Sequence, residues 1–264
     1  MLVLITNDDG IRAPGLAALV AARPADAEIW IMAPDRERSA TGQAITLHKP
    51  LRVDKVPFEP GVTAFQINGT PSDCVKVATE LMERRPDIVL SGINRGSNLG
   101  TDVFYSGTVS GALEAAIYDI PAIALSLDDY DANDPEDYAT AARVGWTLAQ
   151  WVLQVGLPPG TLLNVNVPKG PNIRGWCATR LGLRRYRKVL HRRLDPRGRE
   201  YYWMAGEIED LDGDDETADT VAVRRGYVSI TPISFDLTHY KALDMVRSWQ
   251  LDILGPAPAG GAKR

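Results

Sequence analysis

The sequence has few of the residues from which disulfide frameworks, zinc sites and histidine-based catalytic centres are built. It contains two cysteines, Cys74 and Cys177, which lie far apart and form no CxxC pair, so neither a disulfide framework nor a cysteine zinc site is expected. Its three histidines, His48, His191 and His239, have no metal-ligand spacing. A histidine-centred triad or a phosphohistidine mechanism therefore has little support.

Long hydrophobic runs and the common nucleotide motifs are also missing. No apolar stretch is long enough to span a bilayer. The run from Met1 to Ile5 is too short for a signal peptide and lacks its basic start. The sequence has no GxGxxG, no GxxxxGK(S/T) and no GxSxG, which excludes the usual dinucleotide, P-loop and α/β-hydrolase signatures. We expect a cytoplasmic protein that does not bind membranes.

Positive charge is in deficit, with 29 Lys and Arg against 34 Asp and Glu and a formal net charge of −5. This balance argues against a general nucleic-acid surface, although it leaves room for a local cationic pocket. Residues 180–199 hold a local excess of arginine. The acidic segment 207–219 can neutralise that excess across a hairpin or a subunit interface, so we do not expect nucleic-acid binding.

The composition is that of a packed globular chain. Of the 264 residues, 45% are hydrophobic and 24% are charged, which suits one large α/β domain or one domain with an appendage. Strand and helix patterns alternate, as is typical of a doubly wound, mostly parallel sheet with helices on both faces. Strands are expected at 2–6, 28–32, 44–54, 63–67, 86–90, 121–127 and 162–167, and helices at 16–22, 71–82, 108–118 and 135–154.

The character of the chain changes after about residue 170. Segment 173–206 is rich in Arg and Tyr, and it contains the turn signal Asp195-Pro196-Arg197-Gly198. Residues 220–230 return to strand-like composition, and 238–251 have a helical pattern. We predict a catalytic core over 1–170, an extension of β-hairpins with a closing helix over 171–254, and a flexible tail over 255–264.

Polar clusters follow three of the predicted strands. Asp8 and Asp9 come directly after the first strand, Ser39 follows the second, and Asn94 follows the strand at 86–90. The carboxyl ends of parallel strands meet at one edge of a sheet, where ligands bind. Two adjacent carboxylates at a buried strand end are costly unless a cation compensates them, and these oxygens suit Mg²⁺ or Mn²⁺ better than zinc. The alternative is that Asp8 or Asp9 is an ordinary cap or turn residue.

A second polar element lies at the start of the helix expected from residue 108. Here Ser106, Gly107 and Thr108 combine hydroxyls with free N–H groups and the positive end of a helix dipole, which together can receive a phosphate. The alternative is an N-cap with glycines that permit close packing of helix on sheet.

Six ordered blocks of this sequence resemble the SurE family of 5′/3′-nucleotidases, the stationary-phase survival proteins, and they extend over nearly the whole chain. The matching blocks are 5–10, 33–39, 68–74, 91–94 with Gly100, 105–109 and 226–232.

The resemblance implies one divalent ion per subunit, Mg²⁺ or Mn²⁺, held by Asp8, Asp9, Ser39 and Asn94. It implies hydrolysis of nucleoside 5′- and possibly 3′-monophosphates, with looser activity on polyphosphate in some members. It also implies a Rossmann-like core, and a C-terminal hairpin exchanged between subunits of a homodimer or homotetramer. The chain departs from the family at Gln43, where members often carry Asn or His, so no catalytic role is assigned to this residue.

In this interpretation Asp8 or Asp9 is catalytic and orients or deprotonates the attacking water. The same interpretation expects Asn94, Ser106, Gly107 and Thr108 to stabilise charge on the phosphate.

Three other interpretations stay open: a polyphosphatase, a broad small-molecule phosphatase using the same site, and a non-catalytic nucleotide-binding module.

Overall fold

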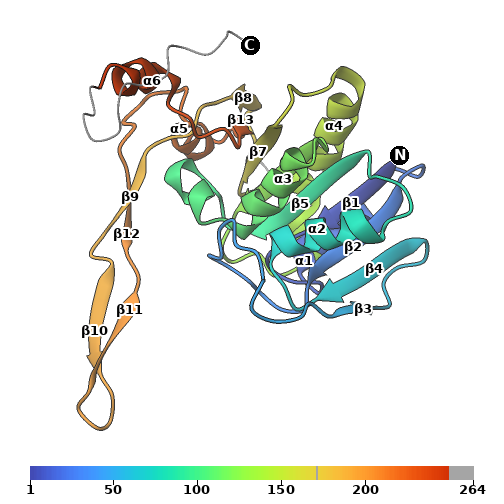
Figure 1. Cartoon of the computed structure of the whole chain (residues 1–264), viewed down its shortest axis with the longest axis horizontal. Helices are drawn as coiled ribbons and strands as arrows, with labels where there is room; N and C mark the ends of the chain where they lie inside the picture. Colours follow the sequence, from blue (N-terminus) through green and yellow to red (C-terminus); the bar gives the residue numbers. More distant parts are fainter. Residues whose placement is uncertain (171, 250–264) are drawn as a thin grey trace.

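The computed structural model describes residues 1–170 and 172–249. Its centre is a nine-stranded sheet in the order β3-β4-β2-β1-β5-β6-β7-β13-β8 (Figure 1). The strands of this sheet are β1 (Leu2–Thr6), β2 (Glu28–Pro34), β3 (Val53–Lys55), β4 (Val62–Ile67), β5 (Ile88–Arg95), β6 (Ala122–Asp128), β7 (Thr161–Pro168), β8 (Trp176–Ala178) and β13 (Val228–Ser234).

The six central strands, β4-β2-β1-β5-β6-β7 in sheet order, are parallel to one another, whereas β3 and β13 pair antiparallel with β4 and β7 at the two ends of this group. Numbered along the chain, the six parallel strands lie in the order 3-2-1-4-5-6, which is that of doubly wound Rossmann folds. The order reverses between β1 and β5, so the crevice outside the carboxyl ends of these two strands is the expected ligand site. The predicted α/β, Rossmann-like fold is confirmed.

Helices cover both faces of the sheet (Figure 1). Alternate residues of β1 point to opposite faces, with Val3 and Ile5 in one apolar core and Leu2 and Leu4 in the other. The first core packs against α1 and α4, and the second against α2 and α3. The helices are α1 (Pro14–Ala21), α2 (Pro71–Leu81), α3 (Gly107–Ile117), α4 (Ala139–Val155), α5 (Asp219–Arg224) and α6 (Tyr240–Arg247), with short 3₁₀ helices η1 (Gly100–Phe104) and η2 (Pro135–Tyr138).

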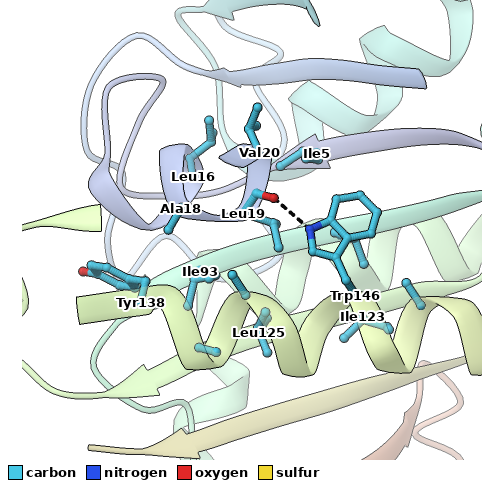
Figure 2. Close-up of a cluster of buried hydrophobic side chains, with 14 of the residues drawn as sticks. Ile5, Leu16, Ala18, Leu19, Val20, Ile93, Ile123, Leu125, Tyr138 and Trp146 are labelled. Atoms are coloured by element: carbon cyan, nitrogen blue, oxygen red, sulfur yellow. Dashed lines mark hydrogen bonds between the residues drawn. The ribbon is translucent and has the colours of Figure 1, made fainter. Parts of the chain in front are cut away.

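Local sequence signals explain how two of these helices begin and pack. Thr70 caps α2 in a capping box with Asp73, and Pro71 occupies the first turn. On the other face, the Trp146 indole of α4 donates a buried hydrogen bond of 2.8 Å to the carbonyl of Leu19 in α1 (Figure 2). That bond satisfies the one polar atom of a large core side chain.

A two-stranded ribbon, here called the arm (residues 184–210), projects away from the sheet (Figure 1). It pairs β9 (Arg184–Arg187) with β12 (Glu207–Asp210), and β10 (Leu190–Leu194) with β11 (Glu200–Met204), all antiparallel. The predicted turn lies at its tip, where the N–H of Asp195 donates to the carbonyl of Arg199 at 2.8 Å. Arg187 pairs with Glu209 across the ribbon, so acidic side chains do neutralise arginines there. No helix in the described ranges is long and apolar enough to cross a membrane.

Two predicted strands were wrong in part. Of the range 44–54, only 53 and 54 are strand, as the first residues of β3. The N–H of Thr46 donates to the carboxylate of Asp73, and that of Arg52 to the side chain of Asn68, in place of a ladder. Of the range 220–230, residues 220–224 belong to α5 and only 228–230 lie in a strand, β13. The buried Asp219 accepts the N–H of Thr220 at the start of this helix. The predicted tail over 255–264 lies outside the described residues.

Candidate active site

The predicted site residues lie around the point where the strand order reverses. Thr6, the last residue of β1, is in register with Ser91 of β5, and the chain continues from there into Asp8 and Asp9. At the end of β5 the pairing with β6 shifts register between Gly92 and Asn94. Loops distant in sequence therefore meet at one edge of the sheet, as the strand pattern predicted.

Asp8 is almost fully buried, with 4% of its surface exposed. Its Oδ1 accepts a hydrogen bond from the hydroxyl of Thr108, in the first turn of α3. Burial raises the pKa of Asp8 above its ordinary value, although the bond from Thr108 opposes this effect. A Cβ added at Gly107 would lie 2.7 Å from the Cβ of Asp8, so only glycine lets the helix start this close to the carboxylate.

Asp9 lies next to a second strand end. Its Oδ2 accepts the backbone N–H of Arg95 at 3.2 Å. Burial, and then the negative charge of Asp8, raise the pKa of Asp9 to about 7. The neighbouring Asn94 donates through its Nδ2 to the carbonyl of Gly96 at 2.8 Å. In the described part of the chain the amide oxygen of Asn94 receives no hydrogen bond, so it is available as a ligand.

Ser39 lies on a turn that the backbone holds between Asp8 and the start of α3. The N–H of Arg38 donates to the carbonyl of Asp8 at 2.7 Å, and the N–H of Gly42 donates to that of Tyr105 at 3.0 Å. The exposed Ser39 hydroxyl donates to Glu37 at 2.7 Å. The turn is thus adjacent to the carboxylates, while the Ser39 side chain itself contacts Glu37.

Glu37 is a site residue that the sequence analysis missed. Its charge contributes to the raised pKa of both Asp8 and Asp9, so it lies within electrostatic reach of the pair. The signal that could have indicated it was its place two residues before Ser39, inside one of the blocks at a strand end.

The start of α3 presents a mixture of capping and free groups. Ser106 is the N-cap, and its Oγ accepts the N–H of Val109 at 3.0 Å, so this hydroxyl does have a capping role. The N–H groups of Gly107 and Thr108 belong to the first turn, where helix geometry supplies no intrahelical acceptor, and the N–H of Thr108 already interacts with the carboxylate of Asp8. A phosphate role for these residues stays a prediction, with the backbone N–H groups better placed for it than the Ser106 hydroxyl.

The donor set fits a hard divalent cation. One buried and one half-buried carboxylate, both with raised pKa values, are electrostatically unfavourable unless positive charge joins them. Over residues 1–170 and 172–249, no group of three or more His, Cys, Asp and Glu side chains could hold a metal. A cation here would therefore bind two carboxylates together with neutral hydroxyl and amide oxygens, a set that suits Mg²⁺ or Mn²⁺ and not zinc.

Comparison with known proteins identifies the family. The family described as "Survival protein SurE" matches residues 3–188. A protein of Symbiobacterium thermophilum named "5′-nucleotidase SurE" is 52% identical over 257 residues, covering 95% of this chain and 98% of that protein. One of the same name from Heliobacterium modesticaldum is 51% identical over 253 residues, covering 94% and 92%. The crystal structure of the SurE protein from Aquifex aeolicus superposes with a TM-score of 0.80 at 39% identity, covering 94% of this chain and 98% of that one. This chain belongs to the SurE family.

Proposed function

We propose that this protein is a metal-dependent nucleotidase that hydrolyses nucleoside 5′-monophosphates to nucleoside and phosphate. The observation that carries the proposal is the largely buried pair Asp8 and Asp9 at the reversal point of the sheet, against the first turn of α3. The name "5′-nucleotidase SurE" of relatives about half identical over most of their length supports the same activity.

The cation would be held by Asp8, Asp9, Ser39 and Asn94. When bound, a divalent ion supplies Lewis acidity toward a phosphate oxygen and offsets the charge of the carboxylates. Asp8 is fixed by the Thr108 hydroxyl and serves mainly to bind. Among the described residues, Asp9 accepts one hydrogen bond, from the backbone N–H of Arg95, so its other carboxylate oxygen could orient the attacking water and accept its proton.

The start of α3 supplies the other half of the site. The N–H groups of Gly107 and Thr108 lie at the positive end of the helix. That of Gly107 would bind an equatorial oxygen of the phosphate, and that of Thr108 would be shared between the phosphate and the carboxylate of Asp8. The Asn94 amide would add a contact to the phosphate. Because these groups are fixed by the helix and the strand before substrate arrives, they stabilise developing charge without reorganisation.

A non-catalytic nucleotide-binding module accounts poorly for this arrangement. Two carboxylates beside an anion repel it, so a protein that merely bound phosphate would gain nothing from Asp8 and Asp9. A cation held by Asp8 and Asp9 would offset their negative charge, so that the same residues would favour phosphate binding and its hydrolysis.

A phosphate-release panel tests the proposal. Nucleoside monophosphates, polyphosphate and an aryl phosphate are compared with Mg²⁺, Mn²⁺ or chelator, for the wild type and for Asp8→Asn. We expect release from nucleoside monophosphates that needs metal and is lost in the variant. Preference for polyphosphate or the aryl phosphate would assign the site to a different phosphatase. Near wild-type turnover by Asp8→Asn would contradict the assignment of Asp8.

The arm is the proposed means of assembly. It carries large apolar side chains that are exposed in the single chain, among them Leu190, Trp203 and Met204, and such a surface favours burial against another protein. We infer that the extension over residues 171–254 serves for assembly, and that two copies of the chain exchange this hairpin in a homodimer or homotetramer. Light scattering of the full chain and of a variant with residues 189–205 shortened to a tight turn tests this, with a smaller assembly expected for the variant.

A further inference from the structure

Glu37 is an acidic side chain at the site to which the proposed reaction assigns no role. Its Oε1 accepts the hydroxyl hydrogen of Ser39 at 2.7 Å. We propose that Glu37 is a positioning residue for Ser39: by holding the hydroxyl proton, it turns the oxygen lone pairs of Ser39 toward the cation. The inference rests on the proposed function, since it requires a cation at the Asp8 and Asp9 pair.

The backbone of the turn is fixed independently of Glu37. The N–H of Arg38 is bonded to the carbonyl of Asp8, and that of Gly42 to the carbonyl of Tyr105. The hydroxyl of Thr41 donates to the carbonyl of Arg38 at 2.9 Å. The position of the Ser39 Cα is therefore set from both sides of the turn.

The Ser39 side chain lacks such constraints. It is exposed, and an exposed serine hydroxyl rotates freely unless a partner selects one orientation. In the described residues the partner is Glu37. Glu37 therefore decides where the hydroxyl proton lies, while the backbone decides where the residue lies.

The chemistry of a neutral hydroxyl ligand explains why this matters. A serine oxygen can bind a cation only through a lone pair, so its proton must point elsewhere, toward an acceptor. The Asp8 and Asp9 carboxylates accept the Thr108 hydroxyl and the N–H of Arg95, and the proposed function assigns their remaining lone pairs to the cation and the attacking water. Glu37 is then the acceptor for the Ser39 proton. Partners of metal ligands that fix orientation in this way typically change affinity by about 10- to 100-fold when removed.

Glu37 also adds negative charge near the pair, and this second effect must be separated from orientation. Glu37→Ala removes both the charge and the acceptor. Glu37→Gln removes the charge but keeps an oxygen that can accept the Ser39 proton. If Glu37 acted only through its charge, both variants would change the affinity for the cation equally. If it positions Ser39, the affinity is largely restored in the glutamine variant.

The experiment measures Mn²⁺ affinity by the electron paramagnetic resonance signal of free Mn²⁺, on full-length protein without substrate. The variants are Glu37→Ala, Glu37→Gln, Ser39→Ala and the double alanine variant. Glu83→Ala is the matched control, because it removes one exposed negative charge just beyond the far end of α2. Circular dichroism checks that each variant is folded.

We expect Glu37→Ala to weaken Mn²⁺ binding about tenfold, Glu37→Gln to stay within about threefold of the wild type, and Glu83→Ala to bind as the wild type does. In the Ser39→Ala background, Glu37→Ala should cost no more than the roughly threefold allowed for loss of its charge, because the hydroxyl that it positions is gone. The inference is overturned if Glu37→Ala binds normally, if Glu37→Gln weakens binding as much, or if the loss persists in the Ser39→Ala background.

The outcome separates this inference from the proposed function. If the wild type binds Mn²⁺ and Asp8→Asn does not, while the Glu37 variants match the wild type, only the positioning role fails. If the wild type binds no Mn²⁺ at the site, the proposed function fails and the positioning role fails with it.

Discussion

Replacing Asp9 by asparagine should stabilise the metal-free protein. Asp9 and Asp8 are adjacent and largely buried, so without a cation the folded chain must either hold two neighbouring negative charges or take up a proton. An asparagine at this position would have nearly the same shape and keep an oxygen for the N–H of Arg95, yet it carries no charge. The wild type therefore sacrifices stability at this position for a site that a cation completes.

The size and pH dependence of the effect follow from the pKa of Asp9, which burial and Asp8 raise from 3.8 to about 7. A carboxyl whose pKa is raised on folding costs nothing below about pH 4, where it is protonated in both states. Its cost grows as pH rises through the folded pKa, and is constant above it. The full cost at pH 8 is about 4 kcal/mol, and water penetration with side-chain movement reduces it to about 1–3 kcal/mol.

Thermal unfolding in chelator at pH 4.5, 6 and 8 measures this cost. Asp9→Asn should unfold roughly 2–10 °C above the wild type at pH 8, with the difference shrinking toward pH 4.5. Saturating Mn²⁺ should raise the midpoint of the wild type by more than that of the variant. Asp54→Asn, an exposed acid on the edge strand β3, serves as the charge control and should change little. Equal or lower stability of Asp9→Asn at pH 8 in chelator would refute the reasoning.

Three further substitutions test how the fold supports the site. Gly107→Ala places a methyl group 2.7 Å from the Cβ of Asp8. We expect the free energy of unfolding in chemical denaturation to fall by about 1–3 kcal/mol, and Mn²⁺ binding in a paramagnetic resonance titration to weaken. Unchanged binding would contradict the close packing. Trp146→Phe removes the buried hydrogen bond to the carbonyl of Leu19. It should lower the free energy of unfolding by about 2 kcal/mol, with little change in phosphate release. A change below about 0.5 kcal/mol would show that this hydrogen bond is dispensable. Thr70→Ala removes the cap of α2 and should cost about 1 kcal/mol in urea denaturation, with Thr70→Ser close to the wild type.

The parallel core could be predicted because its signals are local. Apolar runs such as 2–6 and 121–127 end in turn residues, and buried parallel strands require such runs. Once the strands are parallel, their carboxyl ends lie at one edge, so the strand pattern alone predicts that the Asp8 and Asp9 pair lies near the end of β5, where Asp9 accepts the N–H of Arg95.

The parts that escaped prediction depend on distant partners. Residues 44–52 look like a strand, but the N–H groups of Thr46 and Arg52 donate to the side chains of Asp73 and Asn68 instead. The β-branched residues near Val221 favour a strand locally, while packing and the carboxylate of Asp219 select a helix. Glu37 was missed because no sequence motif distinguishes an exposed acidic residue in a loop. Its place in the site becomes visible only in the structure, where the Ser39 hydroxyl donates to it.

Anomalous diffraction from crystals soaked with Mn²⁺ tests the central claim most directly. The account predicts one Mn²⁺ per chain at the carboxyl end of β1, directly coordinated by carboxylate oxygens of Asp8 and Asp9, with oxygens of Ser39 and Asn94 completing the protein ligands. A Mn²⁺ bound elsewhere, or no anomalous peak within a coordination sphere of Asp8 and Asp9, would contradict it.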